Sequence, residues 1–342
     1  MLFSSSDIGI DLGTSSILVY VKGKGLYLKD PSVVAINTSD NTPIAYGEEA
    51  RRMVGRTPDN IKAIKPLKHG VISNITLTEK MLKHYIEEAI GKVSLRKPRV
   101  VICVPAMCTE IEKKAVEDAA YTAGARSVEI IEEPLAAALG ADIDIDRPEG
   151  NMIVDIGGGT TDIAVIALGG IVCANSIKIA GDDFDQAIID YLKNQHHLLV
   201  GDRTAEQIKI NLGRAIPLSD TEKPITMAVK GRSTQNGYPG EKLIGDDDIY
   251  FVLKESIEEI LKGIKKVFEM TPPELAADIF DKGIYLTGGG SQIYGMDQAI
   301  KTEIGVECLR VDDPLRAVIL GIQKKIMMSE RQAENEWWKL LG

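Results

Sequence analysis

The sequence predicts an α/β fold built from two similar halves. Two short segments, residues 8–20 and 153–165, each run from an apolar strand through an aspartate and a Gly/Thr-rich turn into a second apolar strand. Their aspartates, Asp11 and Asp155, lie 144 positions apart, an interval far longer than a solenoid repeat. Strand and helix patterns alternate around these segments, as is typical of the α/β class. We therefore expect an internal duplication in which each half opens with a β-hairpin.

The rest of the first half alternates helices and strands. Its predicted elements are a helix at residues 78–90, a strand at 99–104, a helix opened by a Thr109–Glu112 capping box, a strand at 128–131 and an alanine-rich helix after Pro134. The acidic stretch 142–149 is the expected boundary between the halves. We expect a first lobe at residues 1–145, a second lobe at 146–321 and a C-terminal tail at 322–342.

The second half repeats this alternation and adds an insert. Its predicted elements are a helix at residues 185–192, a helix from Thr204 with a Thr204–Gln207 capping box, a small β insert at 216–247 with a strand at 225–229, a helix at 257–268 and a strand at 284–286. The last strand leads into Gly288-Gly289-Gly290.

Composition restricts the class of protein. The 342 residues carry a net charge of −10 and are 44% hydrophobic and 26% charged, which is typical of a globular chain of about two domains. A nucleic-acid groove needs concentrated Lys and Arg, so net acidity argues against nucleic acid as the partner.

The cysteines and the N-terminus indicate a cytoplasmic protein. The four cysteines form no CxxC pair, and Cys103 and Cys173 lie in apolar runs that predict core positions. This usage fits a reducing compartment better than a disulfide framework. The first residues lack the basic start and apolar core of a signal peptide, and no stretch approaches the length of a spanning helix.

Each glycine turn taken alone is an ordinary tight hairpin, but together they predict a phosphate site. Residues 13–16 and 157–160 both supply unhindered backbone N–H groups and small hydroxyls, which a polyphosphate requires. Asp11 and Asp155 supply the hard oxygens that Mg²⁺ prefers, usually through retained waters. We expect these two carboxylates to face each other across a cleft between the halves.

The ordered motifs carry a family resemblance. DLGT, EEP, DIGGGTTD, TAEQIK and LTGGG follow one another as in the superfamily of actin, heat-shock chaperone and sugar-kinase ATPases. Within it, residues 7–321 resemble the MreB family of bacterial actin homologues, which includes Mbl and MreBH. The resemblance implies an actin-like ATPase fold, with two duplicated α/β lobes around a nucleotide cleft, and the cofactors ATP and Mg²⁺.

Site residues follow from the same resemblance. The implied nucleotide-binding residues are Gly13, Thr14, Ser15, Ser16, Gly157, Gly158, Gly159, Thr160, Gly181, Asp182, Glu206, Gln207, Ile208, Lys209, Gly288, Gly289, Gly290 and Ser291. The implied catalytic residues are Glu133, Thr160, Asp155 and Asp11, with Asp11 and Asp155 holding Mg²⁺ through water.

Two of these assignments have simpler alternatives. Glu133 would position the attacking water with Thr160, or it is a solvated carboxylate favoured by a helix dipole. Glu206 and Lys209 would contact ribose and adenine, or they form an ordinary i,i+3 pair on a solvated face.

The chain also departs from the family pattern. Ser15-Ser16 stands where the family usually has Ala-Asn, so phosphate binding should survive while the hydrolysis rate is in question. Asn74 replaces a usual aspartate.

The resemblance implies a slow cytoskeletal ATPase that polymerises into filaments organising cell-wall synthesis and rod shape. The implied partners are further copies of the chain, cell-wall synthesis proteins and the anionic inner face of the cell membrane. A small-molecule kinase and a chaperone ATPase of the same fold are the alternatives. A kinase would need a pocket-forming insertion, and the sequence offers none that is large enough beyond residues 216–247. A chaperone ATPase would need a substrate-binding domain after residue 321.

Two segments are candidates for a peripheral membrane anchor. The loop 92–99 offers Val93 and Leu95 among four cations, which would be attracted to anionic lipid. The tail 322–342 carries an apolar helical face with Trp337 and Trp338, which favour the membrane interface. The alternative for the tail is that it packs on its own lobe or frays.

Overall fold

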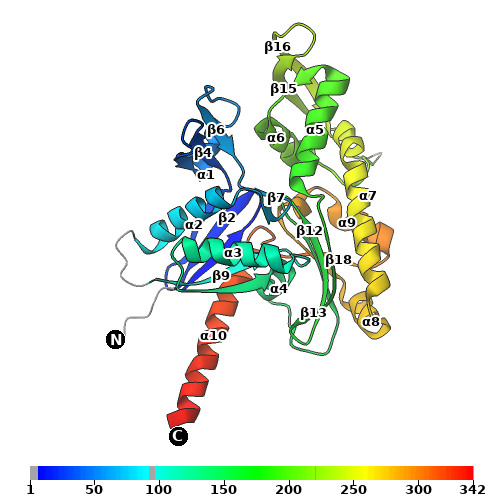
Figure 1. Cartoon of the computed structure of the whole chain (residues 1–342). Coiled ribbons are helices and arrows are strands. Elements are labelled where there is room, and N and C mark those ends of the chain that lie inside the picture. Colours follow the sequence, from blue (N-terminus) through cyan, green and yellow to red (C-terminus); the bar gives the residue numbers. More distant parts are fainter. Residues whose placement is uncertain (1–6, 92–96, 220, 342) are drawn as a thin grey trace.

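The computed structural model describes residues 7–91, 97–219 and 221–341, and the side chains of these segments as far as Ser329. The duplication is confirmed by two sheets of equivalent topology, one in each lobe (Figure 1). In sheet order, the lobe I sheet consists of β10 (Ser127–Glu132), β9 (Arg99–Val104), β1 (Ile8–Leu12), β2 (Ser16–Val21) and β3 (Gly25–Pro31). The lobe II sheet consists of β18 (Cys308–Arg310), β17 (Ile284–Thr287), β11 (Asn151–Ile156), β12 (Thr161–Ala167) and β13 (Gly170–Ile177).

Strand directions match between the two sheets. In each, the first hairpin is antiparallel, and its first strand pairs in parallel with a strand from later in the chain. Parallel pairing needs a crossover connection, which here contains helices. The carboxyl ends of β1 and β11, where the two glycine turns begin, therefore become equivalent positions in the two lobes. The expected division at residue 145 stays a prediction, and the strands of the two sheets fall on either side of it.

Helices cover both faces of each sheet. The outer face of lobe I carries α2 (Ile75–Ile90) and α3 (Glu110–Thr122); the helices of lobe II are α5 (Gly181–His196), α6 (Asp202–Leu212), α7 (Asp246–Met270), α8 (Pro273–Lys282) and α9 (Met296–Ile304). Two helices, α4 (Glu133–Gly140) and α10 (Ala317–Leu341), pack against each other in a shared core between the sheets. Their closest approach is at Gly140 and Gly321, where a Cβ would overlap the backbone of the other helix.

Smaller subdomains extend both lobes on the same side. Lobe I carries β4 (Val34–Asn37), β5 (Pro43–Tyr46), α1 (Gly47–Met53), β6 (Ile61–Ile64), β7 (Leu67–Lys68) and β8 (Val71–Ile72). Lobe II carries β14 (Leu198–Leu199), β15 (Thr226–Ser233) and β16 (Pro239–Gly245), which confirms the predicted β insert.

Most predicted elements are confirmed, with longer boundaries. The Thr109–Glu112 capping box is present on α3, and strand 99–104 has the predicted bounds. The predicted Thr204–Gln207 capping box is wrong. Helix α6 begins earlier, after Gly201, and no side-chain hydrogen bond caps it. Thr204 therefore already lies inside the first turn, where it cannot act as the cap.

The departure at Asn74 has a structural account. Asn74 is the N-cap of α2, and its side-chain oxygen accepts a hydrogen bond from the Leu77 N–H at 3.0 Å. Asparagine and aspartate cap helices about equally well, so the replacement preserves the helix start.

The two cysteines predicted in the core differ in burial. Cys103 on β9 is buried, as predicted, whereas Cys173 on β13 is half-buried.

The two predicted membrane segments lie largely outside what the structure describes. The apolar residues of loop 92–99, Val93 and Leu95, are outside the described residues, as are the side chains of Trp337 and Trp338. At the start of the tail, Ile322 and Ile326 are fully buried in the core shared by the two lobes. That part of the tail therefore packs on the protein itself. In the described segments, no helix combines the length and the apolar character that crossing a membrane requires.

Candidate functional site

The two glycine turns meet at the centre of the molecule. A Cβ on Gly158 would overlap Ser15 Oγ, and a Cβ on Gly159 would overlap Thr14 Oγ1. Glycine at these two positions is therefore what allows the β11–β12 turn of lobe II to touch the β1–β2 turn of lobe I. The structure brings together the two loops that the sequence predicted as phosphate loops.

Each turn has the same internal hydrogen bond. The Gly13 N–H donates to the Ser16 carbonyl at 3.1 Å, and the Gly157 N–H donates to the Thr160 carbonyl at 2.9 Å. The lobe I turn is also held from outside, since the Ser32 hydroxyl donates to the Gly13 carbonyl at 2.7 Å. The duplication thus extends to the backbone geometry of the two turns.

The hydroxyl of Thr14 remains able to donate to a ligand. Thr14 Oγ1 accepts a hydrogen bond from the Gly70 N–H at 3.0 Å. A hydroxyl that accepts through its oxygen keeps its own proton for donation. Thr14 can therefore serve a phosphate oxygen without losing its contact with the Gly70 loop.

Asp11 and Asp155 end the apolar strands β1 and β11 and lie beneath the turns. Burial raises the pKa of Asp11 to about 6, although the Cys103 thiol donates to Asp11 Oδ1 at 3.2 Å and acts in the opposite direction. Burial, and then the charges of Asp162 and Asp11, raise the pKa of Asp155 well above its ordinary value. The charge of Asp11 thus contributes to the raised pKa of Asp155, while the expectation that the two carboxylates face each other across a cleft stays a prediction.

Glu133 belongs to the same cluster of carboxylates. It is the first residue of α4, directly after β10, and its pKa is raised well above its ordinary value by burial, then by the charges of Asp162, Asp11 and Asp155. A carboxyl with this surrounding differs from a solvated helix-start carboxylate, for which no such shift is expected. The structure therefore places Glu133 beside the predicted metal carboxylates.

Thr160 is buried where three segments converge. A Cβ on Gly70 would crowd both Thr160 Cγ2 and Pro105 Cγ, so the 66–72 loop and the end of β9 of lobe I press against the turn of lobe II. This places the predicted partner of Glu133 at the junction of the lobes.

Asp162 is a buried carboxylate to which the sequence analysis gave no role. Its Oδ1 accepts a hydrogen bond from the Ala106 N–H of lobe I at 2.9 Å, and its Oδ2 is buried with no hydrogen-bond partner. In the register of the β11–β12 hairpin, Asp162 lies directly opposite Asp155. The signal in the sequence was a carboxylate at the start of an otherwise apolar strand. Burial raises the pKa of Asp162, as it does those of Asp11, Glu133 and Asp155.

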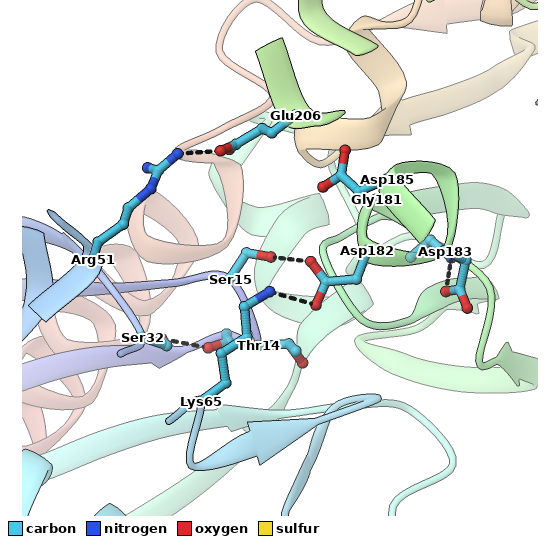
Figure 2. A network of polar contacts seen from close by, with 12 residues as sticks. Thr14, Ser15, Ser32, Arg51, Lys65, Gly181, Asp182, Asp183, Asp185 and Glu206 are labelled. Carbon is cyan, nitrogen blue, oxygen red and sulfur yellow. Dashed lines mark hydrogen bonds and ion pairs between the residues drawn. The ribbon is translucent and has the colours of Figure 1, made fainter. Parts of the chain in front are cut away.

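The N-terminus of α5 rests on the lobe II turn. The Gly181 and Asp182 N–H groups donate to the carbonyls of Gly157 and Gly158 at 3.1 and 2.8 Å. The Asp182 carboxylate then reaches lobe I, where Oδ1 accepts from the Ser15 hydroxyl at 3.0 Å and Oδ2 pairs with Lys65 Nζ at 3.0 Å (Figure 2). One carboxylate of lobe II thus binds two donors of lobe I.

Glu206 and Lys209 on α6 do not pair with each other. Glu206 forms an ion pair with Arg51 of α1 across the two lobes (Figure 2), whereas Lys209 Nζ donates to the Gly181 carbonyl at 2.7 Å and pairs with Asp185 at 2.9 Å. Of the residues between them, Gln207 is exposed and Ile208 is fully buried in the lobe II core. Ile208 can therefore offer a ligand only its backbone.

The Gly288-Gly289-Gly290 turn closes the site from the side of β17. Gly288 has a φ of +83°, and a Cβ there would overlap Asp155 Oδ1. Ser291, in the short 3₁₀ helix η1 (Gly289–Gln292), donates from its hydroxyl to the Gly288 carbonyl at 2.6 Å. The third glycine motif therefore packs directly against the predicted metal carboxylate.

The residues present fit a magnesium–polyphosphate. The two turns supply small hydrogen-bond donors, and the glycines at which they touch carry no Cβ. Buried carboxylates that repel one another supply the negative charge that a divalent cation would neutralise. Among the described residues, no group of three or more His, Cys, Asp or Glu side chains is arranged to hold a metal ion directly. Binding of Mg²⁺ by Asp11 and Asp155 through water stays a prediction.

Comparison with known proteins agrees with this geometry. A family model described as MreB/Mbl protein matches residues 5–334. The cell shape-determining protein Mbl of Bacillus subtilis is 48% identical over 315 residues, which cover 92% of this chain and 94% of that protein. The structure resembles MreB5 of Spiroplasma citri bound to ADP, with a TM-score of 0.91, 35% identity and coverage of 97% of this chain and 99% of that one. MreB5 has also been solved bound to AMPPNP. At 24% identity, a MamK double helical filament shares the fold, with a TM-score of 0.78 over 95% of this chain and 99% of that one.

Proposed function

Because the chain belongs to the MreB/Mbl protein family and has its actin-like fold, we propose that it is a slow ATPase that binds Mg-ATP between its lobes and polymerises into filaments. The observation that carries the proposal is the contact between the two glycine turns, which are 144 positions apart in the sequence. The nucleotide-bound MreB5 structures support it, since they share the fold over nearly the whole chain.

The two turns would hold the phosphates. The hydroxyls of residues 13–16 and 157–160, and those of their backbone N–H groups that are not bonded within the turns, would donate to phosphate oxygens. Gly181 and Asp182 would approach the phosphates from the N-terminus of α5. Asp11 and Asp155 would hold Mg²⁺ through its waters. When bound, the metal would supply the positive charge that lets a polyphosphate lie beside the carboxylates of Asp11, Glu133, Asp155 and Asp162.

Glu133 and Thr160 would act in hydrolysis. Glu133 accepts a hydrogen bond from the attacking water and Thr160 fixes its position, so that the water lies in line with the bond that breaks. Their location beside Asp11 and Asp155, at the junction of the lobes, supports this assignment. Asp162, with its unpartnered oxygen, adds negative charge to the same cluster.

The nucleoside would lie between α6 and the Gly288 turn. Glu206 and Lys209 would contact ribose and adenine, and Gln207 and Ile208 would contribute their backbone. Residues 288–291 would cover the base, in a turn where Gly288 and Gly290 leave no room for a Cβ. In the structure, Glu206 is paired with Arg51, and Lys209 is bound to the Gly181 carbonyl and to Asp185. Nucleotide binding therefore includes an exchange of these contacts.

The filaments would organise cell-wall synthesis and rod shape at the cytoplasmic face of the membrane. The similarity to the cell shape-determining protein Mbl and the fold shared with a filament-forming protein support this part of the proposal. Its partners would be further copies of the chain, cell-wall synthesis proteins and anionic lipid, reached through loop 92–99 or the tail.

A sedimentation assay tests the proposal. Wild-type protein with Mg-ATP should pellet at high speed above a threshold concentration, because head-to-tail contacts that do not close produce open filaments. Protein without nucleotide is the control. A chain that binds ATP yet stays monomeric at tens of micromolar, a concentration on the order of weak-interface dissociation constants, would favour the kinase alternative.

A further inference from the structure

We propose that Lys65 is a phosphate-binding residue of this site, and that its ammonium group exchanges Asp182 for the polyphosphate when a nucleotide binds. The inference rests on the proposed function and adds a residue from outside the three glycine motifs. Lys65 follows β6 in the smaller subdomain of lobe I. The sequence analysis gave it no role.

Lys65 lies next to the proposed phosphate loops. Its Nζ lies 3.0 Å from Asp182 Oδ2, while Asp182 Oδ1 accepts a hydrogen bond from the Ser15 hydroxyl at 3.0 Å (Figure 2). Ser15 in turn touches Gly158. The ammonium group therefore shares one carboxylate with a donor that belongs to the first phosphate loop and contacts the second.

The donors around Asp182 already bind an anion. The Ser15 hydroxyl and the Lys65 ammonium converge on the two oxygens of one carboxylate. A phosphate oxygen accepts the same two kinds of hydrogen bond, and bears more charge than a carboxylate. Asp182 thus marks a position where this chain stabilises an anion between its lobes.

The proposed phosphate loops lack positive charge of their own. Neither residues 13–16 nor residues 157–160 contain Lys or Arg, while Asp11, Glu133 and Asp155 surround them with carboxylates. A triphosphate adds further negative charge, of which Mg²⁺ neutralises only part. A lysine at the loops would supply positive charge that the loops themselves lack.

Other cations of the network are less available for this role. Lys209 is 15% exposed and is held by both Asp185 and the Gly181 carbonyl. Arg51 pairs with Glu206, on the side where the sugar is proposed. In the network as the structure describes it, Lys65 is the cation bound next to a phosphate loop.

The present partner of Lys65 is easily exchanged. The side chains of Lys65 and Asp182 are 37% and 29% exposed, and ion pairs with this exposure contribute little to stability. Lysine is also a mobile point charge on a flexible stem, which suits a residue that changes partners.

The test measures affinity for Mg-ATP by calorimetry in wild type, Lys65→Ala and Lys65→Arg. Losing a charged hydrogen bond should weaken Mg-ATP binding by about tenfold or more, and Lys65→Arg should restore most of it. The control variant is Lys282→Ala on α8, whose lysine is 28% exposed and pairs with Glu149 at 2.8 Å away from the site. Circular dichroism verifies that each variant is folded.

A double-mutant cycle separates phosphate binding from a merely structural role. Lys65→Ala is also made in the Asp182→Asn background, where the carboxylate charge is gone. If Lys65 binds phosphate, the loss in affinity persists in that background; if Lys65 only holds Asp182 in place, the loss disappears and the proposal is overturned. Equal affinities for Lys65→Ala and Lys282→Ala would overturn it too. A wild type that binds no nucleotide would instead contradict the proposed function, and the assignment of Lys65 with it.

Discussion

Asp11 and Asp155 occupy equivalent positions, each the last residue but one of its strand, β1 or β11, and the charge of Asp11 contributes to the raised pKa of Asp155. Each carboxylate comes from one copy of a duplicated hairpin. Neither copy can form this arrangement alone, because it exists only when the two sheets pack with their glycine turns in contact. The pair therefore makes the proposed nucleotide site a property of the lobe interface.

Removing either carboxylate should weaken magnesium-dependent binding. Asp11→Ala or Asp155→Ala should raise the dissociation constant of Mg-ATP by about tenfold or more, because each removes an anchor of the hydrated ion. Calorimetry with Mg²⁺ and with EDTA measures the effect, and the variants should differ little from wild type in EDTA. Unchanged affinity in both variants would contradict the two-turn site.

Glu133 should matter for hydrolysis and little for binding. Glu133→Ala should lower the rate of phosphate release by about tenfold or more, because a group that positions the attacking water acts in the transition state. Its Mg-ATP affinity should stay close to that of wild type, and its filaments should persist longer. Phosphate release at the wild-type rate would show that the assignment is wrong.

The stability of the nucleotide-free protein should depend on pH through Asp185. Burial raises the pKa of Asp185 to about 6, against the opposing effect of Lys209, so the folded state binds this proton more tightly than the unfolded state does. Its contribution to stability is then fully present below about pH 4 and is lost as the pH rises through about 6. Asp185→Asn should lack this dependence.

Denaturant unfolding of wild type and Asp185→Asn at several pH values measures that contribution. Relative to the variant, the free energy of unfolding of wild type should fall by at most about 3 kcal/mol between pH 4 and pH 7. The comparison between two chains cancels the other titrating groups. A difference that is constant over this range, or that grows with pH, would show that the pKa of Asp185 is not raised.

Anionic liposomes should bind the ATP-loaded protein. Leu95→Ser combined with truncation after Met328 should abolish flotation with the liposomes, because it removes apolar residues from both candidate anchors. Each change made alone identifies the segment that contributes more. Flotation of the combined variant at the wild-type level would show that neither segment is the anchor.

The sequence identified most of the elements because their signals are local. The apolar run at residues 99–104 and the Thr109–Glu112 capping box appear in the structure as predicted. Helix starts were less predictable. Glycine stands before both α6 and α7 and has no side chain with which to cap them, so these helices begin where the residue type at the cap gives little signal.

The candidate site was only partly predictable. Its glycine turns and the aspartates before them form motifs, so they could be found along the chain. Lys65 and Arg51 belong to no such motif, and Asp162, although it ends the DIGGGTTD motif, gave no sign of its contact; the partners Asp182, Glu206 and Ala106 are contributed by the opposite lobe. Sequence separation hides contacts of this kind.

By itself, the sequence determined the duplication, the α/β class and the family, because these follow from strand patterns and motifs that repeat within short segments. Only the tertiary structure decided that Glu133 is desolvated beside Asp11 and Asp155 and that Asp182 binds Ser15 and Lys65. The physical reason is that burial and charge proximity depend on how two separately folded sheets pack. No local pattern of residues encodes the distance between two lobes.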